Sequence, residues 1–380
     1  MQAIKPEIKL SPLGSVPFRI FFTSLRKDFL LSWTRFMKHF NSLCSGIVLA
    51  CFFISQNLFG FSGTEGASFL ELPAGARPAA LGGAYSSLAS DAYAPTFNPG
   101  GLGFLQSPQV SAMHLLYVQD TSTEYLSYVQ PITSGHAIGF AAQYFRPGTI
   151  TATDTAGNTI GDFGGYYGAY SLAYGQKLTD WASLGATGKW ISAKIDNVTA
   201  SAFAADVGAL FQCTPNWRIS AVASNYGGKL TFLQQSDPLP SLWRVGTAYR
   251  PLQSLTLVLE GTHRQSGLNS AAGGIEWSNA QGYSIRGGYD TEHTQGLSAL
   301  SGMTLGLGLN LWGQELAYAW SPLSDLGSAH YFSLVFRFGE EHKELLKRSE
   351  IDEEGADFNS DMNDVSGGSS DSSTPSLGNP

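Results

Sequence analysis

Between Gln106 and Phe338 the chain repeats one pattern, in which apolar and polar residues alternate over about fourteen short segments. In the clearest segment, Met303–Leu311, leucines alternate with Thr, Gly and Asn. Successive side chains of a β-strand point to opposite faces, so such a segment shows leucines on one side and small or polar groups on the other. The repeated pattern predicts an all-β fold, a transmembrane antiparallel β-barrel with lipid outside and a filled lumen. A soluble β-sandwich would also alternate and is the competing fold.

The connections between these segments alternate between short and long. The short ones stand at Pro131–Gly135, Leu178–Trp181, Thr214–Trp217, Pro251–Ser254, Ser278–Gly282 and Trp312–Gln314. The long polar ones include Arg146–Phe163, Gly227–Pro240, Asp290–Ser301 and Ser321–Ala329. Bacterial barrels have short periplasmic turns and long outer loops, so we expect a strict alternation, an even number of strands near fourteen, and both ends of the barrel domain in the periplasm.

The N-terminal region resembles a targeting signal. An apolar run at Cys44–Phe61 follows Lys38, as the h-region of a signal peptide follows its charged n-region. We therefore assign residues 1–62 to the signal peptide region, with cleavage after Ser62 and Met37 as an alternative start. The three residues before Cys51 loosely resemble a lipoprotein cleavage box, which keeps lipidation open as a second processing route.

The rest of the chain divides into three parts. We assign residues 63–105 to an N-terminal hatch, 106–339 to the barrel and 340–380 to an acidic tail. The tail has eleven acidic and three basic residues. Its few apolar groups cannot offset the entropy lost on ordering, so we expect it to be disordered in the periplasm. A solvated tail and a partner-binding peptide are the two interpretations of its charge.

The segment before the first strand is rich in small and turn-forming residues. Asn-Pro starts a turn, and paired glycines permit positive φ and close backbone approach. Such a segment fits inside a lumen as a plug, and Arg77–Ala89 can supply a short helix; a flexible periplasmic lead-in is the alternative. The hatch residues singled out by this pattern are Gly82, Gly83, Asp91, Asn98, Pro99, Gly100 and Gly101.

At these residues the chain resembles a known family. The order Ala-Leu-Gly-Gly-Ala, a following Asp, and Asn-Pro before Gly-Leu is similar to the PorV/PorQ family of outer-membrane proteins, relatives of the FadL-type fatty-acid transporters. The resemblance spans about residues 64–339 and implies a fourteen-stranded barrel with an N-terminal hatch. Two features depart from the family. Gly100 stands where the family usually has Ala, and the last strand ends at Phe338 inside the chain, so its signal for the assembly machinery is internal.

Alternation also places charges on the lumen face. They can pair across the barrel or hold the hatch, and a selective polar channel would use the same residues. This set comprises Lys189, Asp206, Arg244, Arg250, Glu260, Glu276, Arg286 and Arg337. A hydrophobic ligand path is favoured instead by aromatic residues near the outer rim, namely Tyr144, Phe145, Tyr166, Tyr167, Trp190 and Phe232. The expected selectors are the outer loops Gly148–Asp162 and Gly228–Pro240.

Several classes of function find no support in the sequence. The histidines are scattered without metal-ligand spacing, and no Ser lies in a Gly-x-Ser-x-Gly elbow, so we expect no enzyme, no metal and no cofactor. Removal of the leader would leave Cys213 as the sole cysteine, which excludes intramolecular disulfides. The mature chain is acidic and has no basic stripe, so we expect no nucleic acid partner.

Two mechanisms follow from the resemblance. A PorV-like barrel would be a docking platform for substrates of type IX secretion, whereas a FadL-like barrel would take up long-chain fatty acids or other hydrophobic molecules when the hatch around Asn98 and Pro99 shifts. A purely structural role is a third possibility. The expected partners are outer-membrane lipid, a hydrophobic small molecule or a secreted protein, and the outer-membrane assembly machinery.

Overall fold

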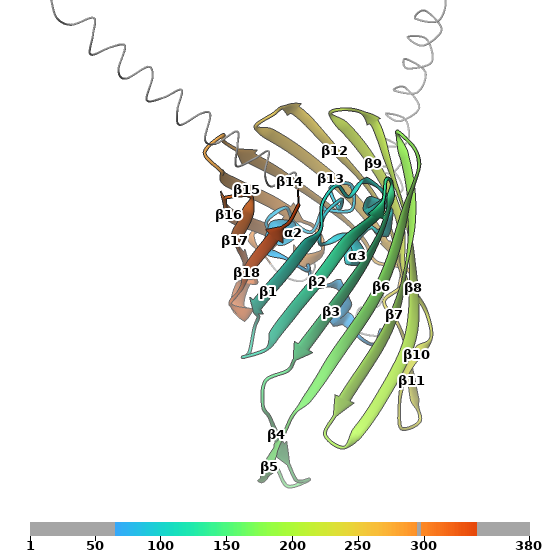
Figure 1. The fold of residues 1–380 in the computed structure, drawn as a ribbon. Helices are drawn as coiled ribbons and strands as arrows, with labels where there is room; N and C mark the ends of the chain where they lie inside the picture. The colour runs from blue at the N-terminus through green and yellow to red at the C-terminus, as the bar shows by residue number, and fades with distance from the viewer. Residues whose placement is uncertain (1–64, 295–297, 340–380) are drawn as a thin grey trace, which may run out of the picture. The chain divides into compact units, whose positions relative to one another are not determined.

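The computed structural model describes residues 65–294 and 298–339, so the predicted signal peptide region and the acidic tail lie outside the described residues. Fourteen antiparallel strands form a closed barrel around short helical segments (Figure 1). The predicted fold and strand number are confirmed. The barrel strands are β1 Gln109–Leu116, β2 Ser122–Thr133, β3 His136–Arg146, β6 Gly165–Thr179, β7 Ala182–Ile195, β8 Val198–Thr214, β9 Trp217–Gly227, β12 Leu242–Leu252, β13 Leu255–Arg264, β14 Asn269–Ser278, β15 Tyr283–Asp290, β16 Met303–Leu311, β17 Gln314–Pro322 and β18 Ser328–Arg337.

The ring closes between its first and last strands. β1 pairs with β2 on one side and with β18 on the other, in a register that sets Gln109 opposite Arg337 and Leu116 opposite His330. A closed ring leaves no strand edge without backbone partners, which is the condition for a sheet in hydrocarbon. Among the described residues no helix is both long and apolar enough to cross a membrane.

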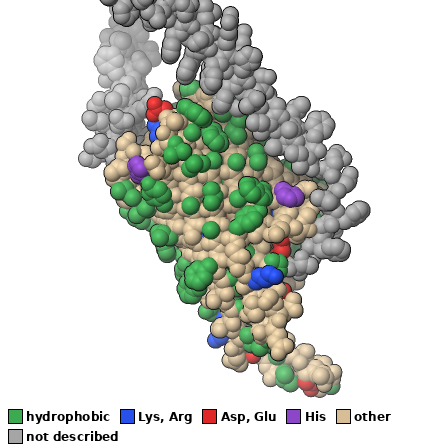
Figure 2. Space-filling model, turned by 90° about the vertical axis from the view of Figure 1, so that its right-hand side faces the viewer, with side chains coloured by type: hydrophobic (Ala, Val, Ile, Leu, Met, Phe, Trp, Pro, Cys, Tyr) green, Lys and Arg blue, Asp and Glu red, His purple; other side chains and the backbone are tan. Residues whose placement is uncertain are grey.

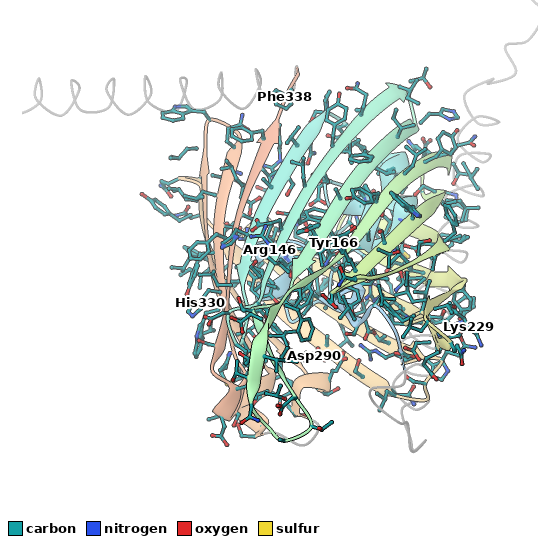
Figure 3. The ribbon with its side chains drawn as sticks, turned by 90° about the horizontal axis from the view of Figure 1, so that it is seen from below. Arg146, Tyr166, Lys229, Asp290, His330 and Phe338 are labelled. Carbon is teal, nitrogen blue, oxygen red and sulfur yellow. The ribbon has the colours of Figure 1, made fainter. Side chains whose placement is uncertain are left out.

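The two rims of the barrel differ. The turn rim carries tight turns such as Ser134–Gly135, Asp180–Trp181 and Pro215–Asn216. The loop rim carries two hairpins, β4 Ile150–Thr153 with β5 Thr159–Phe163 and β10 Lys229–Phe232 with β11 Gln235–Pro238 (Figures 1 and 3). Three 3-10 turns of the described residues also lie at this rim, η3 Glu292–Thr294, η4 Ala299–Gly302 and η5 Ser324–Leu326.

The expected strict alternation of short and long connections is wrong at two places on the loop rim. Only Asp196 and Asn197 join β7 to β8, and residues 265–268 join β13 to β14. Each pair of strands there forms a tight hairpin, because β7 and β8 remain paired up to Ile195 opposite Val198. The parity of the strands is unaffected.

Side chains alternate between the outer face and the lumen as the sequence predicts. On β16 Leu305 and Leu307 are exposed, while Thr304 and Gly306 between them are buried. Hydrophobic side chains spread over the outer wall (Figure 2). Exposed tryptophans lie toward both rims, as in the aromatic girdles of membrane proteins: Trp190 and Trp243 near the loop rim, Trp277 and Trp312 near the turn rim. The barrel is therefore of the kind found in bacterial outer membranes.

Candidate functional site

Residues 65–105, the hatch, fold inside the barrel. They form η1 Ser68–Glu71, α2 Ala76–Ala80, α3 Ala94–Phe97 and η2 Pro99–Phe104 (Figure 1). Many hatch side chains are fully buried, among them the large rings of Tyr85 and Tyr93, which meet edge to face. The lumen is thus filled by a folded segment instead of open water.

The predicted helix over residues 77–89 is confirmed only at its start. α2 ends at Ala80, because Gly82 and Gly83 adopt φ values of +68° and +82°, a conformation that terminates a helix. Gly82 also lies against the backbone of Tyr289 on β15, at a place where a Cβ would be 2.8 Å from a carbonyl oxygen. The chain therefore needs glycine there for two reasons, its φ and its close approach to the wall.

Three glycines on neighbouring strands form a flat strip on the inner wall, which we call the glycine strip. Gly175 on β6 pairs with Gly185 on β7, and Gly185 pairs with Gly208 on β8. A Cβ at Gly185 would overlap the backbone of Pro99, and one at Gly208 would overlap the side chain of Asn98. The predicted Asn-Pro turn therefore rests directly on the backbone of the wall, where no larger residue would leave it room.

Asn98 fixes this turn by hydrogen bonds on three sides. Its Nδ2 donates to the carbonyl oxygens of Ser86 (2.9 Å) and Ala209 (3.1 Å), and its Oδ1 accepts from the Gly100 N–H at 2.9 Å. The side chain is fully buried. One residue thus caps η2, ties the hatch to itself and ties it to β8. Gly101 follows, packed so tightly against the Ala89 carbonyl that a Cβ would overlap it.

Hydroxyl groups of the wall satisfy further hatch carbonyls. Short helical segments leave many backbone groups without internal partners, and a buried carbonyl without one is costly. These bonds are Ser127 Oγ to Ala92 O at 2.6 Å, Ser183 Oγ to Gly100 O at 2.6 Å, Thr187 Oγ1 to Pro95 O at 3.1 Å and Thr304 Oγ1 to Ala80 O at 3.1 Å. The small polar residues on the lumen face therefore hold the hatch in one position.

On the opposite wall the hatch meets a chain of ion pairs, which we call the charge ladder. Arg77 of α2 binds both carboxylate oxygens of Glu276, at 2.7 and 2.8 Å. Glu276 also accepts from Arg286 at 2.6 Å, and Arg286 reaches Glu315 at 2.6 Å. Arg337 completes the ladder by binding Glu315 at 3.0 Å. The bidentate and shared contacts make these strong, oriented pairs.

Asp91, a predicted hatch residue, is the internal partner of Arg77. Its carboxylate lies 3.8 Å from the Arg77 guanidinium and accepts a hydrogen bond from the Tyr85 hydroxyl. Burial raises the pKa of the Asp91 carboxyl above its ordinary value, although Arg77 and the Tyr85 hydroxyl oppose the rise. The hatch therefore carries its own counterion for Arg77.

The remaining predicted lumen charges fall into two pairs and one exception. Lys189 pairs with Asp206 at 2.6 Å, and Arg244 lies 3.7 Å from Glu260. Arg250 is exposed at the turn rim, where the pairing of β12 with β13 shifts register beyond Tyr249. Most of these charges therefore form ion pairs on the lumen face, which is the first of the two roles that the sequence suggested for them.

Between the hatch and the loop rim lies a cavity of about 720 Å³, which we call the vestibule. Its floor is hatch segment 65–73, and its sides come from strand ends at the loop rim and from the β10–β11 hairpin. A volume of this size suits a small organic ligand. Of the two outer loops expected to select a ligand, only the second, through Leu230, Phe232 and Asp237, lines the cavity.

One wall of the vestibule is aromatic. Phe69 of η1 packs against Phe145 of β3 and Tyr167 of β6, with ring centroids 6.3 and 5.8 Å away, and Phe145 and Tyr167 are 6.2 Å apart. Leu230 and Phe232 from the outer hairpin pack against the same cluster. The backbone N–H of Gly66 donates to Pro238 O at 2.8 Å, so this hairpin is fastened to the first described residues of the hatch.

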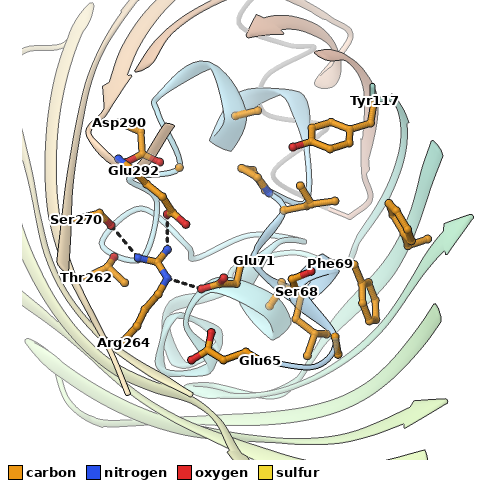
Figure 4. A pocket seen from close by; sticks show the side chains of 18 of the residues that line it. Glu65, Ser68, Phe69, Glu71, Tyr117, Thr262, Arg264, Ser270, Asp290 and Glu292 are labelled. Atoms are coloured by element: carbon orange, nitrogen blue, oxygen red, sulfur yellow. Dashed lines mark hydrogen bonds and ion pairs between the residues drawn. The ribbon is translucent and has the colours of Figure 1, made fainter. Parts of the chain in front are cut away.

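The facing wall is charged. Arg264 at the end of β13 donates from Nε to Glu71 of the hatch at 2.6 Å, from another nitrogen to Glu292 of the loop rim, and to Ser270 at 3.1 Å (Figure 4). Its side chain is only 6% exposed. Burial raises the pKa of the nearby Glu65 carboxyl, and the Glu71 charge adds to the rise, whereas Ser266 and Arg264 oppose it. The vestibule is thus amphipathic.

Sequence reasoning missed Arg77, Arg264, Glu315 and the glycine strip. Arg264 and Glu315 each continue the set of alternate residues of their strand that face the lumen. The alternation could therefore have predicted that both point inward. The pairing of Arg264 with Glu71 had no sequence signal, because the partners are 193 positions apart. Among the described residues no group of three or more His, Cys, Asp or Glu is placed to hold a metal ion.

Comparison with known proteins identifies the fold. A model of an uncharacterised protein family, UPF0164, matches residues 42–180. No curated protein sequence matches the chain. The barrel is similar to CymD, described as a monoaromatic hydrocarbon channel, at 13% identity and a TM-score of 0.50, over 70% of this chain and 98% of that one.

Two further solved structures are similar but less closely superimposed. The Pseudomonas putida toluene transporter TodX has 12% identity and a TM-score of 0.48, over 71% of this chain and 99% of that one. A Pseudomonas aeruginosa FadL homologue has 12% identity and a TM-score of 0.45, over 66% and 95%. At these identities the likeness to CymD establishes a shared fold, and the narrower resemblance to PorV/PorQ stays a prediction.

Proposed function

We propose that this barrel is a passage for small hydrophobic molecules across the bacterial outer membrane, and that such molecules first bind in the vestibule. The observation that carries the proposal is the cavity of about 720 Å³ with its wall of Phe69, Phe145 and Tyr167, enclosed by an apolar outer surface. The shared fold with CymD, a monoaromatic hydrocarbon channel, supports the same conclusion.

The aromatic wall suits weak and reversible capture. A phenyl ring that leaves water buries on the order of 150 Å², which at 25 cal/mol per Å² stabilises the complex by about 4 kcal/mol. This corresponds to roughly millimolar affinity before the cost of association is subtracted. A molecule bound so weakly is able to leave the vestibule again, as passage requires.

Passage beyond the vestibule requires the hatch to move. Its segments fill the lumen, and Asn98 holds its central turn on the glycine strip. The expectation that the hatch shifts around Asn98 and Pro99 therefore becomes a specific proposal, in which the turn leaves the strip while the fourteen strands stay paired.

The test produces the full-length protein in the outer membrane of a bacterial host that lacks its own channels for hydrophobic compounds. We expect uptake of toluene or a similar aromatic hydrocarbon by these cells to exceed that of cells without the protein, and to fall severalfold in Phe69→Ala and Phe145→Ala. Phe140→Ala is the matched control, because Phe140 is 45% exposed on the outer face of the same strand, β3, as Phe145. Equal entry with and without protein would reject the proposal.

The second candidate is the docking of secreted proteins, which the PorV/PorQ resemblance implies. The observation in its favour is the β4–β5 hairpin, which extends from the loop rim without lining the vestibule (Figure 1). Replacing residues 150–163 by a short Gly-Ser turn should abolish export of surface proteins in the source bacterium if docking is the function. The same change should leave hydrocarbon uptake by the host cells intact if passage is the function.

A further inference from the structure

We infer that the vestibule selects hydrophobic molecules with a positively charged head group and rejects anionic ones, fatty acids included. This inference rests on the proposed function and specifies the substrate class of the same cavity. Three observations carry it: the charges of the lining residues, the way the arginines are already paired, and the aromatic wall opposite them.

The lining of the vestibule is strongly acidic. Among the described residues that line it, two carry a positive charge, Arg244 and Arg264. The carboxylates that line it are Glu65, Glu71, Asp237, Glu260, Asp290 and Glu292. Two guanidinium groups against six carboxylates give a formal charge of −4 when all are ionised. An anion that enters is therefore repelled, and a cation is attracted.

Both arginines are engaged by acids of the same lining. Arg264 binds Glu71 at 2.6 Å and also binds Glu292, and Arg244 lies 3.7 Å from Glu260. A carboxylate ligand would have to displace one of these acids and leave it without its cation. Such a ligand would exchange one ion pair for another and gain little, while it paid the cost of its own desolvation.

The aromatic wall completes a site for a hydrophobic cation. Phe69 lies across the pocket from Asp290 and Glu292 (Figure 4), and Phe145 and Tyr167 extend the ring cluster around it. Aromatic faces attract ammonium groups through their quadrupole and also bury an apolar body. A molecule of this class can therefore place its apolar part on Phe69 and its cationic head toward the acids.

The test compares three probes with the same phenyl ring and four-carbon chain. They are 4-phenylbutyltrimethylammonium, 4-phenylbutanol and 4-phenylbutyrate, titrated calorimetrically into the full-length protein in nonionic detergent. We expect the cation to bind most tightly, the alcohol next, and the carboxylate at least tenfold more weakly than the cation. Equal binding of cation and carboxylate, or tighter binding of the carboxylate, would overturn the inference and leave the proposed function intact. Failure of all three to bind would instead reject the proposed function.

A double variant tests whether these acids set the preference. Glu71→Gln with Glu292→Gln removes two carboxylates and releases Arg264, so we expect the ratio of cation to carboxylate affinity to fall at least tenfold. Glu124→Gln is the matched control, since Glu124 pairs with His114 on the outer face and does not line the vestibule. An unchanged ratio in the double variant would contradict the assignment. If the double variant fails to assemble, the comparison of the three probes on the unaltered protein still decides the question.

Discussion

Replacing Asn98 with Ala should loosen the hatch at the β6–β8 wall while the barrel stays assembled. The substitution removes three hydrogen bonds, at 2.9, 3.1 and 2.9 Å, from a fully buried side chain. Each such bond contributes about 1 kcal/mol net, and more where a buried partner is left unsatisfied, so the hatch should lose about 3 kcal/mol of local stability. Opening of η2 should become roughly a hundredfold more frequent.

Hydrogen exchange measures this opening directly. Amides of residues 100–105 should exchange roughly a hundredfold faster in Asn98→Ala, whereas amides of the barrel strands should exchange as before. Asn158→Ala is the control, because Asn158 makes its bonds within the exposed β4–β5 hairpin. Unchanged exchange at residues 100–105 in a correctly assembled barrel would refute the role assigned to Asn98.

Three further predictions follow from the wall and the vestibule. Gly185→Val should displace the Asn-Pro turn and expose the hatch to proteolysis, whereas Gly188→Val on the same strand, where a Cβ meets nothing within 4 Å, should have no such effect. Glu276→Gln should lower the stability of the barrel to heat by about 3 kcal/mol, because it removes the carboxylate that Arg77 and Arg286 share and leaves Arg77 with Asp91 alone and Arg286 with Glu315 alone, and Glu124→Gln should change it little. Binding of 4-phenylbutyltrimethylammonium should weaken as the pH falls from 7 to 5, because burial raises the pKa of the Glu65 carboxyl above its ordinary value and the vestibule loses this negative charge when the carboxyl is protonated; calorimetry at several pH values measures the loss.

The barrel could be predicted from the sequence because its signal is local and repeated. In every strand apolar and polar residues alternate with a period of two, so a wrong boundary for one strand does not change the fold that the other strands predict. The hairpins β4–β5 and β10–β11 were expected only as loops, since most of their residues stand beyond the wall and few face a lumen or lipid.

The candidate site was predicted only in part, because its main contacts depend on register and on the folded hatch. Gly175, Gly185 and Gly208 are each ordinary in sequence and become a strip only when three strands align them. The sequence predicted a turn at the Asn-Pro motif, but it did not predict that this turn packs against the glycine strip. The vestibule likewise combines hatch, strand ends and an outer hairpin, which no single stretch of sequence contains.

The glycine strip and the charge ladder both hold the hatch, and they differ in the free energy that is lost when the hatch moves away from them. On the glycine strip, departure of Asn98 breaks its one hydrogen bond to Ala209 and leaves a carbonyl of β8 without that partner. On the charge ladder, Glu276, Arg286, Glu315 and Arg337 are two acids and two bases, so the ladder stays neutral and paired when Arg77 leaves. Arg77 in turn takes Asp91 with it inside the hatch. Along the charge ladder, therefore, no buried charge loses its last counterion, and separation there avoids the largest penalty that buried ion pairs impose. The charged wall therefore adds little electrostatic cost to a movement of the hatch, and the contacts of Asn98 are the main ones that oppose the departure of the turn from the glycine strip.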